Sequence, residues 1–348
     1  MDSEFIIISG FVIFILIVLA IDLGLFTSTV KPVSVKQASV MSGVWFGLAI
    51  CAYLLILNKG DLLHNIKNPG ELLQINSRYF HHLRFSSNDF QNNLQAYRKN
   101  LAVEFISGYV VEYTLSIDNI LVMVLIFTAF GVSANHYRKI LLWGIIGAIM
   151  MRFCFIFPGA ALIARFHWIL YAFGAFLVYT GVDMYRKRNE EKEVDAENHR
   201  VVKLAAKYLP VFPQFKGDRF FVRLNGQKMI TPLFLVLLII EFTDLIFAVD
   251  SVPAVFSITK DPYIVFFSNI FAILGLRSMF FLLVNVIDRF HYLKTGLAAL
   301  FLFIGLKMLA GDYADRVGLS TVNSLLIILG ILTITAGASL LFPRKKAA

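Results

Sequence analysis

Residues 241–253 read EFTDLIFAVDSVP and place three acidic side chains, Glu241, Asp244 and Asp250, inside a strongly apolar stretch of the chain. A charged carboxylate near the centre of a bilayer costs about 2.5–3.5 kcal/mol on membrane-insertion scales. If this stretch spans a membrane, its acids must be protonated, paired with basic side chains or neutralised by a bound cation. The rest of the sequence decides whether it does so.

The composition is that of a helical membrane protein. Hydrophobic residues make up 58% of the 348 residues and charged residues 16%, whereas about a quarter of a typical soluble protein is charged. Apolar segments of about twenty residues, each able to cross a hydrocarbon core of about 30 Å, recur along the chain. We predict an all-α polytopic membrane protein with about nine transmembrane helices, at residues 5–26, 39–57, 101–130, 139–161, 166–185, 230–257, 263–287, 292–310 and 320–342.

The distribution of basic residues orients the chain in the membrane. The formal net charge is +9, and most Lys and Arg residues fall into the connections on one side of the nine spans. By the positive-inside rule that side is cytoplasmic, so we expect the amino terminus outside and the carboxyl terminus, PRKKAA, inside. This placement favours the lipid bilayer as the partner of these charges and argues against nucleic acid. The sequence leaves the oligomeric state open.

A second acidic motif, EYTLSIDNILV, begins at Glu112. Setting Asp118 against Asp250 also aligns Glu112 with Asp244. A rival register aligns EYT at Glu112 with EFT at Glu241 and inserts three residues before the second acid. Both registers stay open, and either one relates the third span to the sixth.

The similarity continues downstream of both motifs. GAIMMRF matches AILGLRS, which sets Arg152 against Arg277, and FLVYTGVDM matches LFLFIGLKM, which sets Gly181 against Gly305. Spans three to five therefore recur as spans six to eight. Because each unit has an odd number of spans, the copies must have opposite orientations, as in many secondary transporters. The expected organisation is two amino-terminal helices (1–58), a polar extracytoplasmic loop (59–100), repeat one (101–185), a charged cytoplasmic loop (186–229), repeat two (230–310), and a last helix with a basic tail (311–348).

The two motifs hold five acids, which the two intramembrane arginines, Arg152 and Arg277, cannot balance. Charged and unpaired, they would cost on the order of 12–17 kcal/mol, as much as the stability of a whole folded domain. A structural salt-bridge network is one explanation and a bound cation is the other. Carboxylate, amide and hydroxyl oxygens suit hard ions such as Mg²⁺, Ca²⁺ or Mn²⁺. The candidate metal ligands are Glu112, Asp118, Asn119, Glu241, Asp244 and Asp250, with Ser116, Ser251, Thr243, Arg152, Arg277 and Asp22 as supporting residues.

Two further polar positions shape the expected geometry. Pro253 cannot donate to the carbonyl of Val249, so a local break of the helix is expected beside Asp250. On an unbroken helix Asp244 and Asp250 would point about 120° apart, and only a kink would let both face one ion. Asn269, alone in an apolar span, could line the same cavity, but a single amide in a membrane helix more often bonds a neighbouring helix, which is the role expected here.

Four stretches, SIDNILV, EFTDLIFAVDSVPAVF, FAILGLRSMFF and LFIGLKML, resemble the TerC family of integral membrane proteins. The resemblance extends over nearly the whole chain. The long polar segment at 58–100 and Asp183, where a basic residue is expected, depart from the family pattern. The resemblance implies a location in the bacterial inner membrane, a link to manganese export and an association with tellurium resistance.

These observations lead to a functional hypothesis. We expect a secondary transporter that exports a divalent cation, with Mn²⁺ as the expected ion, through the acidic site between the two repeats. Carboxylates that lose their cation in an apolar site should take up protons, which would couple transport to a proton gradient. The alternative is a non-transporting membrane scaffold linked to tellurium resistance or redox stress. No nucleotide-binding or hydrolase motif occurs, so neither an enzyme nor a prosthetic group is expected.

Overall fold

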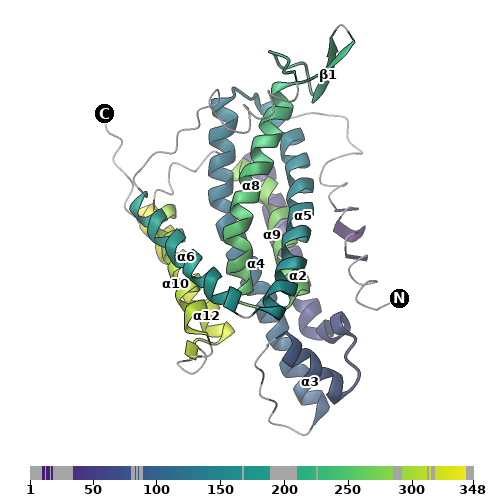
Figure 1. Ribbon diagram of the computed structural model, residues 1–348, viewed down its shortest axis with the longest axis vertical. Coiled ribbons are helices and arrows are strands. Elements are labelled where there is room, and N and C mark those ends of the chain that lie inside the picture. The colour runs from purple at the N-terminus through teal and green to yellow at the C-terminus, as the bar shows by residue number, and fades with distance from the viewer. Residues whose placement is uncertain are drawn as a thin grey trace.

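The computed structural model describes residues 10–11, 13–15, 17–18, 34–79, 83, 85, 89–166, 168–188, 210–224, 226–284, 292–311, 313–314 and 318–341. Within these ranges the chain is almost entirely helical (Figure 1). Its named elements are α2 (Val35–Lys59), η1 (Gly60–His64), α3 (Pro69–Arg78), α4 (Phe90–Ala129), α5 (Ala134–Arg165), α6 (Trp168–Arg186), β1 (Phe221–Leu224), β2 (Gln227–Ile230), α8 (Pro232–Phe256), α9 (Pro262–Leu283), α10 (Leu293–Ala310) and α12 (Thr321–Leu341).

Eight helices in the described part of the chain are long and apolar enough to cross a membrane. They coincide with the second to ninth predicted spans, so the prediction of an all-α polytopic membrane protein is confirmed. The first predicted span, 5–26, lies largely outside the described residues, although the described positions between 10 and 18 are helical. One short antiparallel hairpin, β1–β2, is the exception to the helical fold and lies in the predicted cytoplasmic loop.

Local sequence signals set where these helices begin. Ser34 caps α2 through a capping box with Gln37. Pro232 opens α8, and Pro262 opens α9 directly after Asp261, whose carboxylate accepts the backbone N–H of Tyr263 at 3.0 Å. Proline at the first position of a helix loses no hydrogen bond, because that N–H has no partner within the helix.

The segment before the third predicted span is more ordered than the loop expected at 59–100. It contains η1 and α3, and α4 begins at Phe90, well before the predicted start of that span. Asp89 caps α4, and Arg98 forms an ion pair of 2.6 Å with Asp61 of η1. Hydropathy does not detect this first part of α4, because it is an amphipathic helix that buries Leu94 and Tyr97 under a polar face.

A buried contact between His64 and Asp261 ties this segment to the core. Nε2 of His64 lies 3.1 Å from Oδ2 of Asp261, and both side chains are fully buried. Thr259, in the turn before α9, donates a hydrogen bond of 2.7 Å to Glu104 of α4. The turn between α8 and α9 is therefore fixed to α4 and η1 at one end of the bundle.

The core consists of α4, α5, α8 and α9, with α2 packed against α4 and α9. Helix α9 is the central element. In its most apolar stretch 94% of the residues are buried, whereas in that of α12 only 11% are buried. Figure 1 shows α6, α10 and α12 grouped beside these core helices. Residues on the inner faces of α4, α5, α8 and α9 therefore meet away from the lipid.

Helices α6 and α10 approach closely through glycines. A Cβ added to Gly305 would lie 2.8 Å from the carbonyl oxygen of Gly174, and one added to Gly181 would lie 2.9 Å from that of Ala298. The predicted alignment that matches Gly181 with Gly305 also matches Gly174 with Ala298. The contact of Gly305 with Gly174 therefore corresponds, under the repeat, to the contact of Gly181 with Ala298. This reciprocity supports the repeat at this seam, while the full inverted repeat stays a prediction.

The prediction of a break in α8 is wrong. The helix runs without interruption from Pro232 to Phe256, and Pro253 lies within its last turn. A proline near the carboxyl end of a helix removes a single hydrogen bond and leaves few residues to redirect. Asp244 and Asp250 consequently remain on different faces of α8.

Candidate metal site

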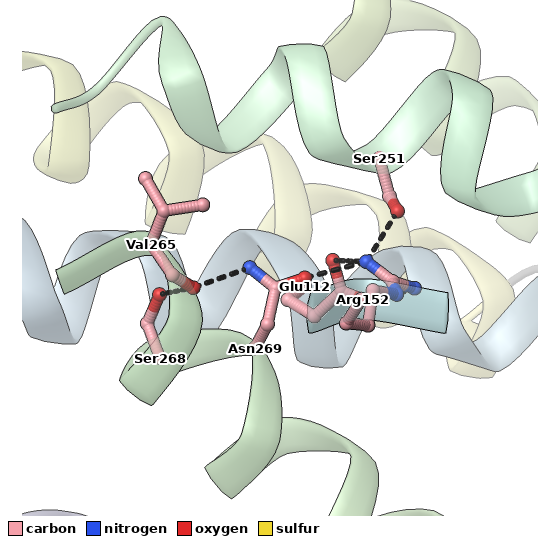
Figure 2. A network of polar contacts seen from close by, with 6 residues as sticks. All are labelled: Glu112, Arg152, Ser251, Val265, Ser268 and Asn269. Atoms are coloured by element: carbon pink, nitrogen blue, oxygen red, sulfur yellow. Dashed lines mark hydrogen bonds and ion pairs between the residues drawn. The ribbon is translucent and has the colours of Figure 1, made fainter. Parts of the chain in front are cut away.

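Arg152 of α5 is fully buried among oxygen atoms from three other helices. Its Nη2 lies 2.6 Å from Oε1 of Glu112 and its Nη1 3.0 Å from Oε2, which makes a two-point ion pair with α4. Nη1 also donates to Oγ of Ser251 at 2.8 Å and to Oδ1 of Asn269 at 2.5 Å. Figure 2 shows these side chains converging on the guanidinium from α4, α8 and α9. We call Arg152, Glu112, Ser251 and Asn269 the Arg152 network.

Asn269 is held in one orientation. Its amide nitrogen donates to the carbonyl oxygen of Val265 at 2.8 Å, which turns its amide oxygen towards Arg152 (Figure 2). Ser268 donates to the same carbonyl at 3.1 Å. The prediction that Asn269 bonds a neighbouring helix is confirmed. The bond to Arg152 also connects Asn269 to the acidic motifs, the alternative that its sequence position had left open.

Two acids of α8 extend this arrangement. Asp244 is 5% exposed, and its charge interacts with those of Arg152 and Glu112. Glu241, one turn earlier, interacts with Asp244, and its carboxylate lies directly against Gly147 of α5, where any Cβ would overlap it. Glu112 and Asp244 thus share the charge of one arginine, and Glu241 interacts with Asp244.

The other two acids form a separate pair. Asp250 faces α6, where Thr180 donates to its Oδ1 at 3.4 Å. Asp118 of α4 is 5% exposed and lies close enough to Asp250 for the two charges to interact. The structure therefore brings together the two acids that the repeat matches to each other. Thr180 was missed by the sequence reasoning, because nothing in the sequence indicates that α6 faces Asp250.

The supporting residues occupy varied positions. Ser116, Asn119 and Arg277 are buried, as the hypothesis of a polar interior requires. Thr243 instead donates to the carbonyl of Ile239 in its own helix at 2.7 Å, so its hydroxyl hydrogen is directed away from the acids. Asp22 lies outside the described residues.

The acids are divided between two groups and do not converge on one point. Among the described residues, no three His, Cys, Asp or Glu side chains are arranged so that they could hold a metal ion by themselves. The continuous α8 explains this division, because it directs Asp244 towards Arg152 and Asp250 towards α6. A cation here would need hydroxyl, amide or backbone oxygens beside the carboxylates, which is common for hard ions.

Comparison with known proteins gives a consistent result. Residues 97–347 match the family model described as integral membrane protein TerC family. An uncharacterized membrane protein STKORF319 of Myxococcus xanthus is 39% identical over 97% of this chain and 92% of its own length. A putative membrane-bound redox modulator Alx of Escherichia coli K12 is 39% identical over 94% of this chain and 91% of its own length. No solved structure matches.

Proposed function

The chain belongs to the TerC family of integral membrane proteins, and we propose that it is a secondary transporter of a divalent metal cation, with Mn²⁺ as the ion. The observation that carries this proposal is the pairing of Asp118 with Asp250. These are acids on two core helices, α4 and α8, and their charges interact inside the bundle. Two like charges that share a low-dielectric site repel each other, and a divalent cation between them would turn that repulsion into attraction.

The charge balance of the bundle supports a cation as cargo. Glu112 is already matched by Arg152, while Asp244 interacts with the same guanidinium and Glu241 interacts with Asp244. A cluster that served only stability would be expected to balance its charges, because an uncompensated buried charge costs several kcal/mol. An excess of acids suits a protein that binds a cation and releases it again.

The donor chemistry supports the class of ion. Carboxylates, the hydroxyls of Thr180 and Ser251 and the amide of Asn269 supply oxygen only. Oxygen donors favour hard cations over thiolate- and imidazole-seeking ions such as Zn²⁺ or Cu⁺. The choice of Mn²⁺ within that class, and the outward direction of transport, rest on the family resemblance.

A mechanism follows from the position of the acids in the core. Since α4 and α8 belong to different predicted repeats, a change in their relative tilt would expose the acids first to one side of the membrane and then to the other. Carboxylates that release the cation would take up protons, so proton movement in the opposite direction is the expected energy source.

The proposed orientation puts the amino terminus outside the bacterial inner membrane and the β1–β2 hairpin in the cytoplasm. The hairpin and α3 lie at opposite ends of the bundle (Figure 1), which supports their assignment to opposite sides. Single cysteines at the exposed positions Ser77 and Arg223, introduced after replacement of Cys51 and Cys154, test this directly. A membrane-impermeant maleimide should label S77C in intact cells and R223C only after lysis; the reverse pattern would invert the topology.

Flux measurement tests the proposed function. Purified protein in lipid vesicles should carry Mn²⁺ down its gradient, and a pH gradient should accelerate the flux. Asp250→Asn should abolish it. Asp183→Asn, which removes an acid from an exposed pair with Lys187 on α6, should leave it intact. Wild-type vesicles that carry no more Mn²⁺ than empty ones would overturn the proposal.

A second candidate function is a membrane scaffold in redox or stress responses. It is favoured by the printed names of the Alx relatives, which describe a membrane-bound redox modulator. In this case soluble partners would bind the cytoplasmic segment 186–229, part of which docks on α5 through an ion pair of 3.5 Å between His136 and Asp218. Deletion of residues 189–200 should abolish a scaffold function and spare cation flux.

A further inference from the structure

The surroundings of Arg152 resemble the coordination shell of a metal ion. Its terminal nitrogens contact both carboxylate oxygens of Glu112, the hydroxyl of Ser251 and the amide oxygen of Asn269. A two-point carboxylate, a hydroxyl and an amide carbonyl are also the ligands that hard divalent cations take in proteins. These oxygens come from α4, α8 and α9, whereas the cation among them belongs to α5.

We propose that the guanidinium of Arg152 is a tethered substitute for the transported cation. It occupies an oxygen cage formed by Glu112, Ser251 and Asn269, and a divalent cation can displace it from this cage. The inference rests on the proposed function for the identity of the cargo. It adds a second cation position beside the Asp118–Asp250 pair and gives Arg152 a defined role in the transport cycle.

An unused oxygen points to this second occupant. Oδ2 of Asp244 is buried and has no hydrogen-bond partner among the described residues, although the charge of this carboxylate interacts with those of Arg152 and Glu112. A buried acceptor without a partner loses the hydrogen bonds that it would make with water. Among the described contacts, no ion pair joins this carboxylate to Arg152 in the observed state. Asp244 therefore offers a negative charge next to the cage that a divalent cation could use more fully than the single charge of the guanidinium.

The guanidinium is itself incompletely bonded. Nη1 contacts three oxygens and Nη2 one, while the buried Nε has no hydrogen-bond partner in the described part of the chain. A buried arginine with a purely structural role is stabilised when all of its N–H groups donate hydrogen bonds. Incomplete bonding lowers the free energy needed to move Arg152 aside when a cation enters.

The tethered cation has a consequence for the transport cycle. An empty carrier must return to its first conformation with its acids neutralised by protons or by another cation, because charged acids inside the membrane are costly. Arg152 would neutralise Glu112 in the empty state and withdraw in the loaded state. Without Arg152, Glu112 would need a proton or a metal ion for the return step, so exchange of metal for metal would continue while net flux would fall.

The decisive experiment compares Mn²⁺ binding by the purified wild type with binding by Arg152→Met and Arg152→Lys. If Arg152 competes with the metal, both variants bind Mn²⁺ more tightly, by about tenfold for Arg152→Met. The lysine should act in the same direction, because an ammonium cannot make the two-point contact with Glu112. Added Mn²⁺ should also raise the thermal midpoint of Arg152→Met by more than it raises that of the wild type.

Two controls distinguish competition between Arg152 and Mn²⁺ from a purely structural role of Arg152. In Arg152→Met/Glu112→Gln the cage loses a carboxylate, so the tighter binding should disappear. If Arg152→Met cannot be purified, Arg152→Lys carries the test alone. Equal or weaker Mn²⁺ binding by Arg152→Lys, or an Arg152→Met protein whose stability Mn²⁺ does not restore, would overturn the inference. The proposed function fails on a different result, the absence of Mn²⁺ flux in the wild type.

Discussion

Arg152 and Glu112 form a two-point ion pair between α5 and α4, with contacts of 2.6 and 3.0 Å and almost no exposure of either side chain. This pair distinguishes Glu112 from the other four acids that the sequence grouped with it. Its carboxylate is matched by a guanidinium in the observed state, whereas the charge of Asp250 interacts with that of another acid, Asp118. Stability and cation binding should therefore respond differently to substitutions in the two groups.

The first prediction concerns Glu112. Glu112→Gln leaves the buried guanidinium without its carboxylate, so we expect a loss of about 3–5 kcal/mol of stability. The double variant Glu112→Gln/Arg152→Met should recover much of this loss, because it removes both charges together. Thermal unfolding in detergent without metal provides the measurement, and a Glu112→Gln protein as stable as the wild type would show that the pair is dispensable.

The second prediction concerns the glycine that makes room for Glu241. In Gly147→Ala the new methyl group overlaps the carboxylate, so Glu241 must move away from α5. We expect Mn²⁺ binding to weaken by about tenfold. Gly144→Ala is the matched control on the same helix, since its Cβ would lie 3.7 Å from Ile240 in ordinary contact. Equal affinities of the two variants would exclude Glu241 from the cation site.

The third prediction concerns the seam between α6 and α10. Gly305→Ala places a methyl group 2.8 Å from the backbone oxygen of Gly174, and backbone cannot move aside as a flexible side chain can. We expect a destabilisation of about 1–3 kcal/mol. Gly330→Ala on α12 meets no atom within 4 Å and should be neutral or slightly stabilising. Similar thermal midpoints of both variants would indicate that α6 and α10 can move apart at this contact without loss of stability.

Much of the fold could be predicted from the sequence, because the bilayer imposes a simple rule on length and polarity. In the part of the chain that the structure describes, the apolar segments of about twenty residues are helices, as the membrane requires every backbone group to be bonded within its own segment. The same rule does not apply outside the bilayer. The extension of α4 back to Phe90 depends on tertiary partners such as Asp61.

The candidate site was only partly accessible to sequence reasoning. The repeat matched Asp118 with Asp250, and the structure brings their charges into interaction. It could not indicate that Glu112 pairs with Arg152, or that Gly147 lies under Glu241, since such pairings depend on which helix faces match. The expected kink at Pro253 failed because the effect of a proline depends on how much helix follows it.

The most direct test of the account is equilibrium binding of Mn²⁺ to purified wild type, Asp118→Asn and Asp250→Asn, together with their thermal midpoints. Asparagine keeps the volume of each side chain and removes the charge that attracts the cation. We expect each variant to remain folded and to bind Mn²⁺ at least about tenfold more weakly, while Asp183→Asn binds like the wild type. If both variants lose stability yet retain wild-type affinity for Mn²⁺, the two carboxylates are structural and the cation site lies elsewhere.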